Sequence, residues 1–190
     1  MPGRGGVLQP GVHVHDARPG ELPAIGELRV AAYQAGGFLS DPSHYTETLR
    51  TLGADARGLV LAAEEDGVLL GTIMLQPWPH AGQVVRASDE AEIRALAVSP
   101  AAQGRGVGRA LLRAVIDRAA GLSVRNLVLS TQPNMTAAQR LYLSEGFQRT
   151  PDRDWFPVPG FALLAYLRPR PVSTEGPGSL PAAGQDPAGL

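Results

Sequence analysis

The residue pattern best suited to chemistry is the glycine-rich segment Gln103–Gly108, with the sequence QGRGVG. Glycine has no Cβ, so the backbone N–H groups of such a loop can turn toward a single point. A helical pattern follows. The first N–H groups of a helix have no intrahelical partner and lie at the positive end of its dipole. The loop therefore predicts a receptor for a phosphate or pyrophosphate. A plain strand-to-helix connection with a glycine turn is the alternative.

Two familiar phosphate-binding loops do not fit these residues. A Walker loop requires a lysine after its second glycine, and the chain contains no lysine. The dinucleotide fingerprint requires the spacing G-x-G-x-x-G, whereas the glycines here are spaced G-x-G-x-G. Counted from Gly104 or Gly106, the third required position holds Arg109 or Leu111. The lack of lysine and the spacing of the glycines therefore disfavour both a Walker-type and a dinucleotide-binding enzyme.

Composition and charge indicate a globular protein of one domain. A chain of 190 residues can bury a substantial core, and 44% hydrophobic with 18% charged residues suits such a protein. The net charge of −1 gives no attraction toward nucleic acid or an anionic membrane. No apolar run approaches the ~20 residues of a membrane span, and the first residues lack the apolar core of a signal peptide. We therefore expect a cytoplasmic protein.

Cysteine and histidine content limits the nucleophiles and metal ligands available. The chain has no cysteine, which excludes disulfides, thiolate metal sites and a cysteine acyl-enzyme. Of the four histidines, His13 and His15 would share one face of a strand, but no third ligand lies near them in the sequence. No metal is assigned on this basis.

Hydrophobic periodicity places the folded domain at residues 11–170. Residues 1–10 are rich in glycine and proline, and residues 171–190 have almost no large apolar side chains, so both segments are expected to be flexible. Strands are predicted over 12–16, 59–64, 68–75, 91–98, 126–130, 147–150 and 161–167, and helices over 22–35, 43–52, 107–121 and 136–146. Ser43 is the expected cap of the second helix, and Thr136–Gln139 has the spelling of a capping box. This order predicts a mixed α/β sheet with helices on both faces.

Two motifs resemble the GNAT superfamily of N-acetyltransferases, which bind acetyl-coenzyme A (acetyl-CoA). Gln103-x-x-Gly106-x-Gly108, after a strand ending Leu96-Ala97-Val98, is similar to the pyrophosphate loop of that family. Ala138-x-x-Leu141-Tyr142-x-x-x-Gly146-Phe147 is similar to its helix-to-strand signature, and the element order over residues 12–168 is similar as well. The resemblance implies an N-acetyltransferase domain with a mixed, mostly antiparallel central sheet flanked by helices.

The resemblance further implies that acetyl-CoA is the cosubstrate. The implied binding residues are Leu96, Ala97, Val98, Gln103, Gly104, Arg105, Gly106, Val107, Gly108, Arg109 and Asn134. The pyrophosphate would lie on the N–H groups of residues 104–109. The side chains of Arg105 and Arg109 would add charge-assisted hydrogen bonds, and a solvated helix face is their alternative role. The pantetheine arm would pair like a strand with Leu96 and Val98, because two neighbouring strands of the family splay apart.

One cofactor contact departs from the family pattern. Relatives often carry an asparagine three residues before the alanine of the helix signature, where it contacts the cofactor. Met135 stands at that position here, and Asn134 comes one residue earlier. Asn134 is therefore the residue carried over as the contact.

The resemblance implies direct acyl transfer, in which an amine attacks a thioester carbonyl and a thiolate leaves. Such a reaction needs a base for the amine, donors for the oxyanion and a proton for the sulfur. Glu92 matches a family base, and regular strand alternation would place it on the same face as Val98. A carboxylate paired with Arg94 is the alternative. Tyr142 matches the family acid, with aromatic packing as its alternative, and the oxyanion would be held by a strand N–H near Ala97 or Val98.

The acceptor expected from the resemblance is a primary amine on a small molecule or a peptide. Phe38, Tyr45, Trp78 and the 152–155 segment are candidate walls of its pocket, although ordinary packing explains them as well. Ser130 stands where relatives that acetylate ribosomal-protein N-termini often have a glutamate, so that specialised role is not favoured. A catalytically weak acyl-CoA-binding sensor is the alternative function. A homodimer is the one protein partner that the resemblance suggests, since dimers are common among relatives.

Overall fold

A central sheet with mostly antiparallel pairing organises the molecule. The computed structural model describes residues 11–39 and 44–170, so the flexible ends expected at 1–10 and 171–190, and the expected cap Ser43, lie outside the described residues. The strands are β1 (His13–Asp16), β2 (Leu59–Glu65), β3 (Val68–Pro77), β4 (Glu90–Val98), β5 (Asn126–Thr131), β6 (Gln148–Arg149), β7 (Trp155–Val158) and β8 (Phe161–Pro169). Their order in the sheet is β1-β2-β3-β4-β5-β8-β6, with β7 paired to β8. Among these pairs only β4 and β5 run parallel, so the expected sheet type is confirmed.

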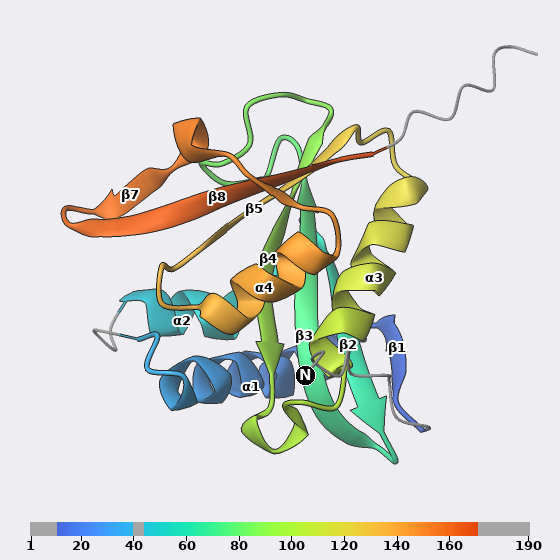
Figure 1. Cartoon of the computed structure of the whole chain (residues 1–190). Coiled ribbons are helices and arrows are strands. Elements are labelled where there is room, and N and C mark those ends of the chain that lie inside the picture. Colours follow the sequence, from blue (N-terminus) through green and yellow to red (C-terminus); the bar gives the residue numbers. More distant parts are fainter. Residues whose placement is uncertain (1–10, 40–43, 171–190) are drawn as a thin grey trace, which may run out of the picture.

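Helices cover both faces of the sheet, as the sequence predicts (Figure 1). They are α1 (Leu22–Ala35), α2 (His44–Thr51), α3 (Val107–Ala120) and α4 (Thr136–Ser144). Alternate strand residues divide between two clusters: Leu61, Ala63, Ile73 and Leu75 pack with Leu111, Leu112 and Val115 of α3, whereas Val60, Ala62 and Met74 pack with Ile25 of α1. This period of two is what buries both faces of a central strand. None of the helices described is long and apolar enough to cross a membrane.

A β-bulge interrupts β4 in the middle of the strand. Thr72 of β3 lies opposite Ala97, but Met74 lies opposite Arg94, so β4 carries one residue more than β3 across this stretch. Ala95 has a φ of 50°, in the left-handed region that non-glycine residues rarely adopt. The bulge therefore reverses which side chains point to each face in the last part of the strand.

The bulge corrects the expected position of Glu92. Ala91 and Ile93 before the bulge, and Leu96 and Val98 after it, all pack on the same core cluster beneath α3. Glu92 alternates with Ile93, so it points to the opposite face from Val98. The prediction of a shared face was wrong because simple alternation does not hold across an inserted residue.

The strands β4 and β5 separate after Ile93 and Leu129 (Figure 1). Their parallel pairing joins Glu90–Ile93 to Asn126–Leu129 and stops there. In the part of the chain that the structure describes, residues 94–98 have no strand partner on the β5 side. The backbone of this half-strand is thus open to pair with an extended ligand.

Two local predictions differ from the structure. The strand β7 was not predicted, because Pro157 breaks the pattern of a strand; β7 pairs with β8 through Trp155 and Val158 at its ends. The helix α4 begins at Thr136 as expected, but no capping box forms. Instead the Gln139 amide donates hydrogen bonds to the carbonyls of Gln132 and Pro133, each at 3.0 Å.

A buried ion pair attaches the segment before β7 to β4. The Arg153 guanidinium donates two hydrogen bonds of 2.8 Å to the Glu90 carboxylate, whose residue is 2% exposed, and the N–H of Arg86 donates a third. Burial alone would raise the pKa of Glu90, but these donors outweigh it and the pKa is lowered. The pair therefore stabilises the fold at neutral pH, and its contribution is lost as the pH falls through the lowered pKa of Glu90.

Replacing Arg153 by methionine should destabilise the protein strongly. The substitution leaves the Glu90 carboxylate buried without its cation, which costs about 3–5 kcal/mol in comparable sites. Urea unfolding at neutral pH measures the change. The control is Arg125→Met, which removes an exposed pair with Asp89 at 3.7 Å and should cost less than about 1 kcal/mol. Equal unfolding midpoints for the two variants would contradict the prediction.

Candidate active site

Two cavities meet in the middle of the domain. The larger, about 670 Å³, is lined by the end of β4, the glycine loop and the start of α4. The smaller, about 580 Å³, lies among α1, α2, the middle of β4, the end of β5 and the β7–β8 hairpin. Tyr33, Phe38 and Met135 line both. Both volumes lie in the range of small-molecule sites, so two reactants could meet at the shared wall.

The glycine loop presents backbone donors to the larger cavity. Gly104 and Gly106 have φ values of 77° and 82°, and α3 begins directly afterwards at Val107. The first hydrogen bond of the helix runs from the N–H of Ala110 to the carbonyl of Gly106. Among the described residues, the N–H groups of Gly104, Gly106 and residues 107–109 have no acceptor. This arrangement fits the phosphate receptor predicted from the sequence.

Most of the predicted cofactor residues line this larger cavity. They are Leu96, Ala97, Val98, Gln103, Gly104, Gly106, Val107, Gly108, Arg109 and Asn134. Met135, at the position of the family asparagine, lines it as well. Arg105 does not: its guanidinium donates to both carboxylate oxygens of Glu65, at 2.8 and 2.7 Å. Arg109 lines the cavity while it also pairs with Glu145 at 2.9 Å, so its charge is partly neutralised within the protein.

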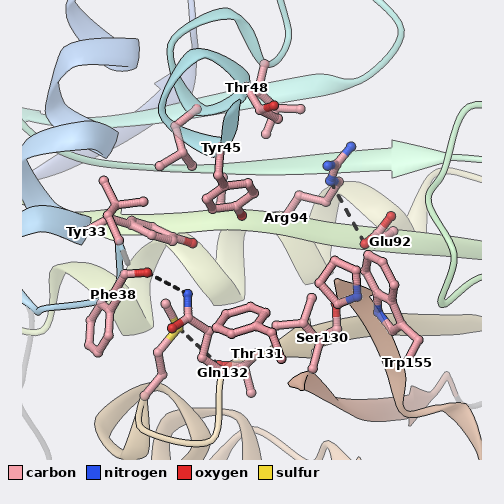
Figure 2. A pocket seen from close by; sticks show the side chains of 18 of the residues that line it. Tyr33, Phe38, Tyr45, Thr48, Glu92, Arg94, Ser130, Thr131, Gln132 and Trp155 are labelled. Atoms are coloured by element: carbon pink, nitrogen blue, oxygen red, sulfur yellow. Dashed lines mark hydrogen bonds and ion pairs between the residues drawn. The ribbon is translucent and has the colours of Figure 1, made fainter. Parts of the chain in front are cut away.

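Glu92 lies in the smaller cavity (Figure 2). Its side chain is 6% exposed; one carboxylate oxygen accepts a 2.6 Å hydrogen bond from the N–H of Gly82, and the other lies 4.0 Å from Nε of Arg94. Burial raises the pKa of Glu92, while Arg94 and the Gly82 N–H partly oppose that effect. The Arg94 guanidinium is itself held by Gln76, at 2.8 Å. The site therefore holds a desolvated carboxylate with a long ion pair to Arg94, so the alternative role predicted for Glu92 is present. Because burial outweighs this pair and raises the pKa, the environment also suits a base.

Aromatic side chains form the walls around Glu92 (Figure 2). Tyr33 of α1 contacts Phe38 and Tyr45, with ring centroids 6.2 and 6.1 Å apart. Trp155 of β7 closes the cavity from the hairpin side, so the wall expected from the 152–155 segment is present. Trp78 is 51% exposed and does not line this cavity. Arg94 and Ser130, which the sequence analysis named for other reasons, line the cavity as well. Thr131 and Gln132 also line it, and they carried no sequence signal beyond their place at the end of β5.

Tyr142 is buried beside the cavities and lines neither of them. Its ring packs against Phe147 and Tyr166, with centroids 5.9 and 6.2 Å away. Tyr142 therefore has the aromatic packing contacts that were its alternative role. Burial raises the pKa of its phenol well above the usual value, and the phenols of Tyr45 and Tyr166 add to the effect. Within the described part of the chain, its hydroxyl has no hydrogen-bond partner. The phenol thus keeps its proton at neutral pH.

Comparison with known proteins identifies relatives of the whole domain. The model of the acetyltransferase (GNAT) family matches residues 22–147. A mycothiol acetyltransferase of Sanguibacter keddieii is 38% identical over 149 residues, which is 75% of this chain and 45% of that protein. The chain spans less than half the length of the mycothiol acetyltransferases that it matches.

Solved structures share the same fold. A GCN5-related N-acetyltransferase from Kribbella flavida is 28% identical with a TM-score of 0.65, over 84% of this chain and 98% of that one. An acetyltransferase from Salmonella typhimurium, solved with acetyl-CoA, is 22% identical with a TM-score of 0.65, over 90% and 99% of the two chains.

Proposed function

Because the chain belongs to the GNAT family of acetyltransferases, we propose that it moves an acetyl group from acetyl-CoA directly to a primary amine. One observation carries the proposal: a cavity with a backbone anion receptor meets a cavity with a buried carboxylate, at a wall that both share. The first accommodates a phosphorylated thioester and the second an amine. Direct transfer requires that two such ligands touch.

The residues of the larger cavity fit the cosubstrate. The uncommitted N–H groups of Gly104, Gly106 and residues 107–109 would hold its pyrophosphate, at the positive end of α3. The half-strand Leu96–Val98, which has no described partner on the β5 side, would pair with the amides of the pantetheine arm. Asn134 and Arg109 lie in the same cavity to contact the remaining polar groups. Acetyl-CoA supplies the activated acyl group.

Two residues are proposed to move the protons. Glu92 takes a proton from the amine, directly or through one water, because a primary amine is mostly protonated at neutral pH. Its raised pKa brings its basicity closer to the working pH. Tyr142 is the proposed proton donor to the leaving sulfur, which requires its hydroxyl to reach the larger cavity that the adjacent Leu141 lines. The backbone near Ala97 and Val98 would stabilise the oxygen on which negative charge develops.

The smaller cavity supports a small molecule or a peptide terminus as acceptor. Most of its walls are aromatic or aliphatic, and Glu92 and Arg94 are the charged groups among its lining residues. Ser130 contributes to this lining, so the glutamate expected of ribosomal-protein specialists is replaced by a small neutral group. The mycothiol acetyltransferase relative supports the small-molecule choice.

A panel of amines, each incubated with the protein and acetyl-CoA, tests the proposal through release of free thiol. The panel should contain aromatic and aliphatic monoamines, amino sugars and short peptides. Amine-dependent thiol release, with the acetylated product identified by mass spectrometry, is the expected result. Tight acetyl-CoA binding without thiol release across the panel would instead favour the acyl-CoA-binding sensor.

Replacing Tyr142 by phenylalanine should lower kcat at least about tenfold, because a positioned general acid contributes roughly 10²- to 10⁴-fold and water can replace part of it. The Kd for acetyl-CoA should stay within about threefold, since the ring remains in place. Tyr166→Phe is the matched control: it removes another buried hydroxyl of the same aromatic cluster, which only reaches Gln139 at 3.3 Å. If both variants keep the kcat of the parent protein, Tyr142 has only a packing role.

A further inference from the structure

A cluster at the outer edge of the sheet brings three metal-ligating side chains together, away from both cavities. His13 and His15 lie on the edge strand β1, and Glu64 lies on β2. One nitrogen of each histidine and one oxygen of Glu64 lie within 4.8 Å of one another. None of the three residues lines either cavity, so the acetyl-transfer site does not account for them.

Strand pairing supplies the ligand that the sequence lacked. His13 and His15 share a face of β1, and the antiparallel register sets His13 directly opposite Glu64. Nε2 of His13 lies 3.0 Å from a carboxylate oxygen of Glu64. Residues opposite each other on adjacent strands have side chains close enough to share a ligand. Glu64 comes from a distant part of the chain, so its closeness to the two histidines was not predictable from the sequence.

One ring nitrogen of His15 is left without a hydrogen-bond partner. Nε2 lies 3.3 Å from both carboxylate oxygens of Glu21, which the N–H of Arg18 holds at 2.6 Å. A neutral imidazole that donates from Nε2 keeps a lone pair on Nδ1. Nδ1 of His15 is buried and has no hydrogen-bond partner. A carboxylate behind a histidine is also the usual second partner of a metal-binding imidazole.

We propose that His13, His15 and Glu64 bind a zinc ion that fastens β1 to β2. Two imidazoles and one carboxylate are a donor set that zinc accepts, with water as the fourth ligand. Ligand atoms around tetrahedral zinc lie about 3.3 Å apart, so only a small closure of the cluster is needed. The His13 side chain is 57% exposed, which leaves an open side for water. The competing arrangement is a plain ion pair between His13 and Glu64.

Titration of the full, tag-free chain with zinc chloride in a calorimeter tests the proposal. We expect one saturable site, and a melting temperature raised by roughly 5–10 °C at a free zinc concentration of about 100 times the Kd. His13→Ala, His15→Ala and Glu64→Gln should each weaken binding at least tenfold. His80→Ala removes an exposed histidine of the 78–89 loop and should bind zinc as the parent does.

The variants are compared only after circular dichroism confirms that they fold, and His13→Ala changes the most exposed ligand, so it is the least disruptive. Absence of saturable binding, or equal binding by the parent and by His13→Ala and His15→Ala, would overturn the proposal. Because acetyl transfer is not the readout, either result leaves the proposed function untouched.

Discussion

Replacing Glu92 by glutamine is expected to lower kcat for acetyl transfer about 10²- to 10⁴-fold, the usual contribution of a general base. Glutamine has nearly the same shape, but it cannot accept the proton of the amine. Acetyl-CoA binds on the other side of the shared wall, so its Kd should stay within about threefold. Steady-state kinetics with an amine from the panel and calorimetry with acetyl-CoA measure the two quantities.

The pH profile separates a base from a carboxylate that only shapes the cavity. A base works when ionised, so kcat/KM of the parent should rise with pH through the pKa of Glu92. Burial places that pKa above the ordinary glutamate value, with Arg94 and the Gly82 N–H partly opposing the shift. This limb of the profile should disappear in Glu92→Gln. A profile unchanged in shape would remove Glu92 as the base.

Stability provides the control for folding. A raised pKa means that the native state binds the Glu92 proton more tightly than the unfolded chain does, so stability falls as the pH rises through that pKa. Glutamine removes this loss and can still accept the hydrogen bond from Gly82. The free energy of unfolding of Glu92→Gln at neutral pH should therefore equal or exceed that of the parent. Glu27→Gln, at a carboxylate that is 66% exposed, should change neither kcat nor the pH profile.

The elements of the fold were predictable where a local pattern decides them. The repeat of Leu111, Leu112 and Val115 marks the buried face of α3, and all three are fully buried. The turn between β2 and β3 is likewise marked by its own residues. The bulge at Ala95 has no such signal, because it arises from the register against β3. A one-residue insertion in a pairing can be read only when both strands are known.

The same distinction applies to the candidate site. The glycine loop was predictable because its N–H groups are oriented by its own backbone and by the helix that follows. Arg105 was predicted to bind phosphate, but its guanidinium pairs with Glu65 of β2. This pair could not be foreseen because Glu65 is distant in the sequence. The closeness of Glu64 to His13 was not predictable for the same reason, because it depends on the pairing of β1 with β2. Local geometry is therefore readable from sequence, whereas the partner of a long side chain depends on tertiary packing.

Replacing Gly106 by valine should weaken acetyl-CoA binding about 10- to 1000-fold. Gly106 has a φ of 82°, which a β-branched residue adopts only with strain, so the loop must turn its backbone. Turning it moves the N–H groups away from the pyrophosphate. A hydrogen bond to a charged group contributes about 1.5–3 kcal/mol, so loss of one or two accounts for the expected range. Calorimetric titration with acetyl-CoA measures the effect.

The control for this variant must carry the same strain elsewhere. Gly160 has a φ of 79° in the turn between β7 and β8, and a Cβ there would meet no atom within 4 Å. Gly160→Val should therefore lose stability through backbone strain, about 1–3 kcal/mol, yet bind acetyl-CoA as the parent does. Only Gly106→Val should combine lost stability with lost affinity. Equal acetyl-CoA affinity in all three proteins would mean that the loop at Gly106 does not hold the pyrophosphate, because an anion held by backbone N–H groups requires that backbone conformation.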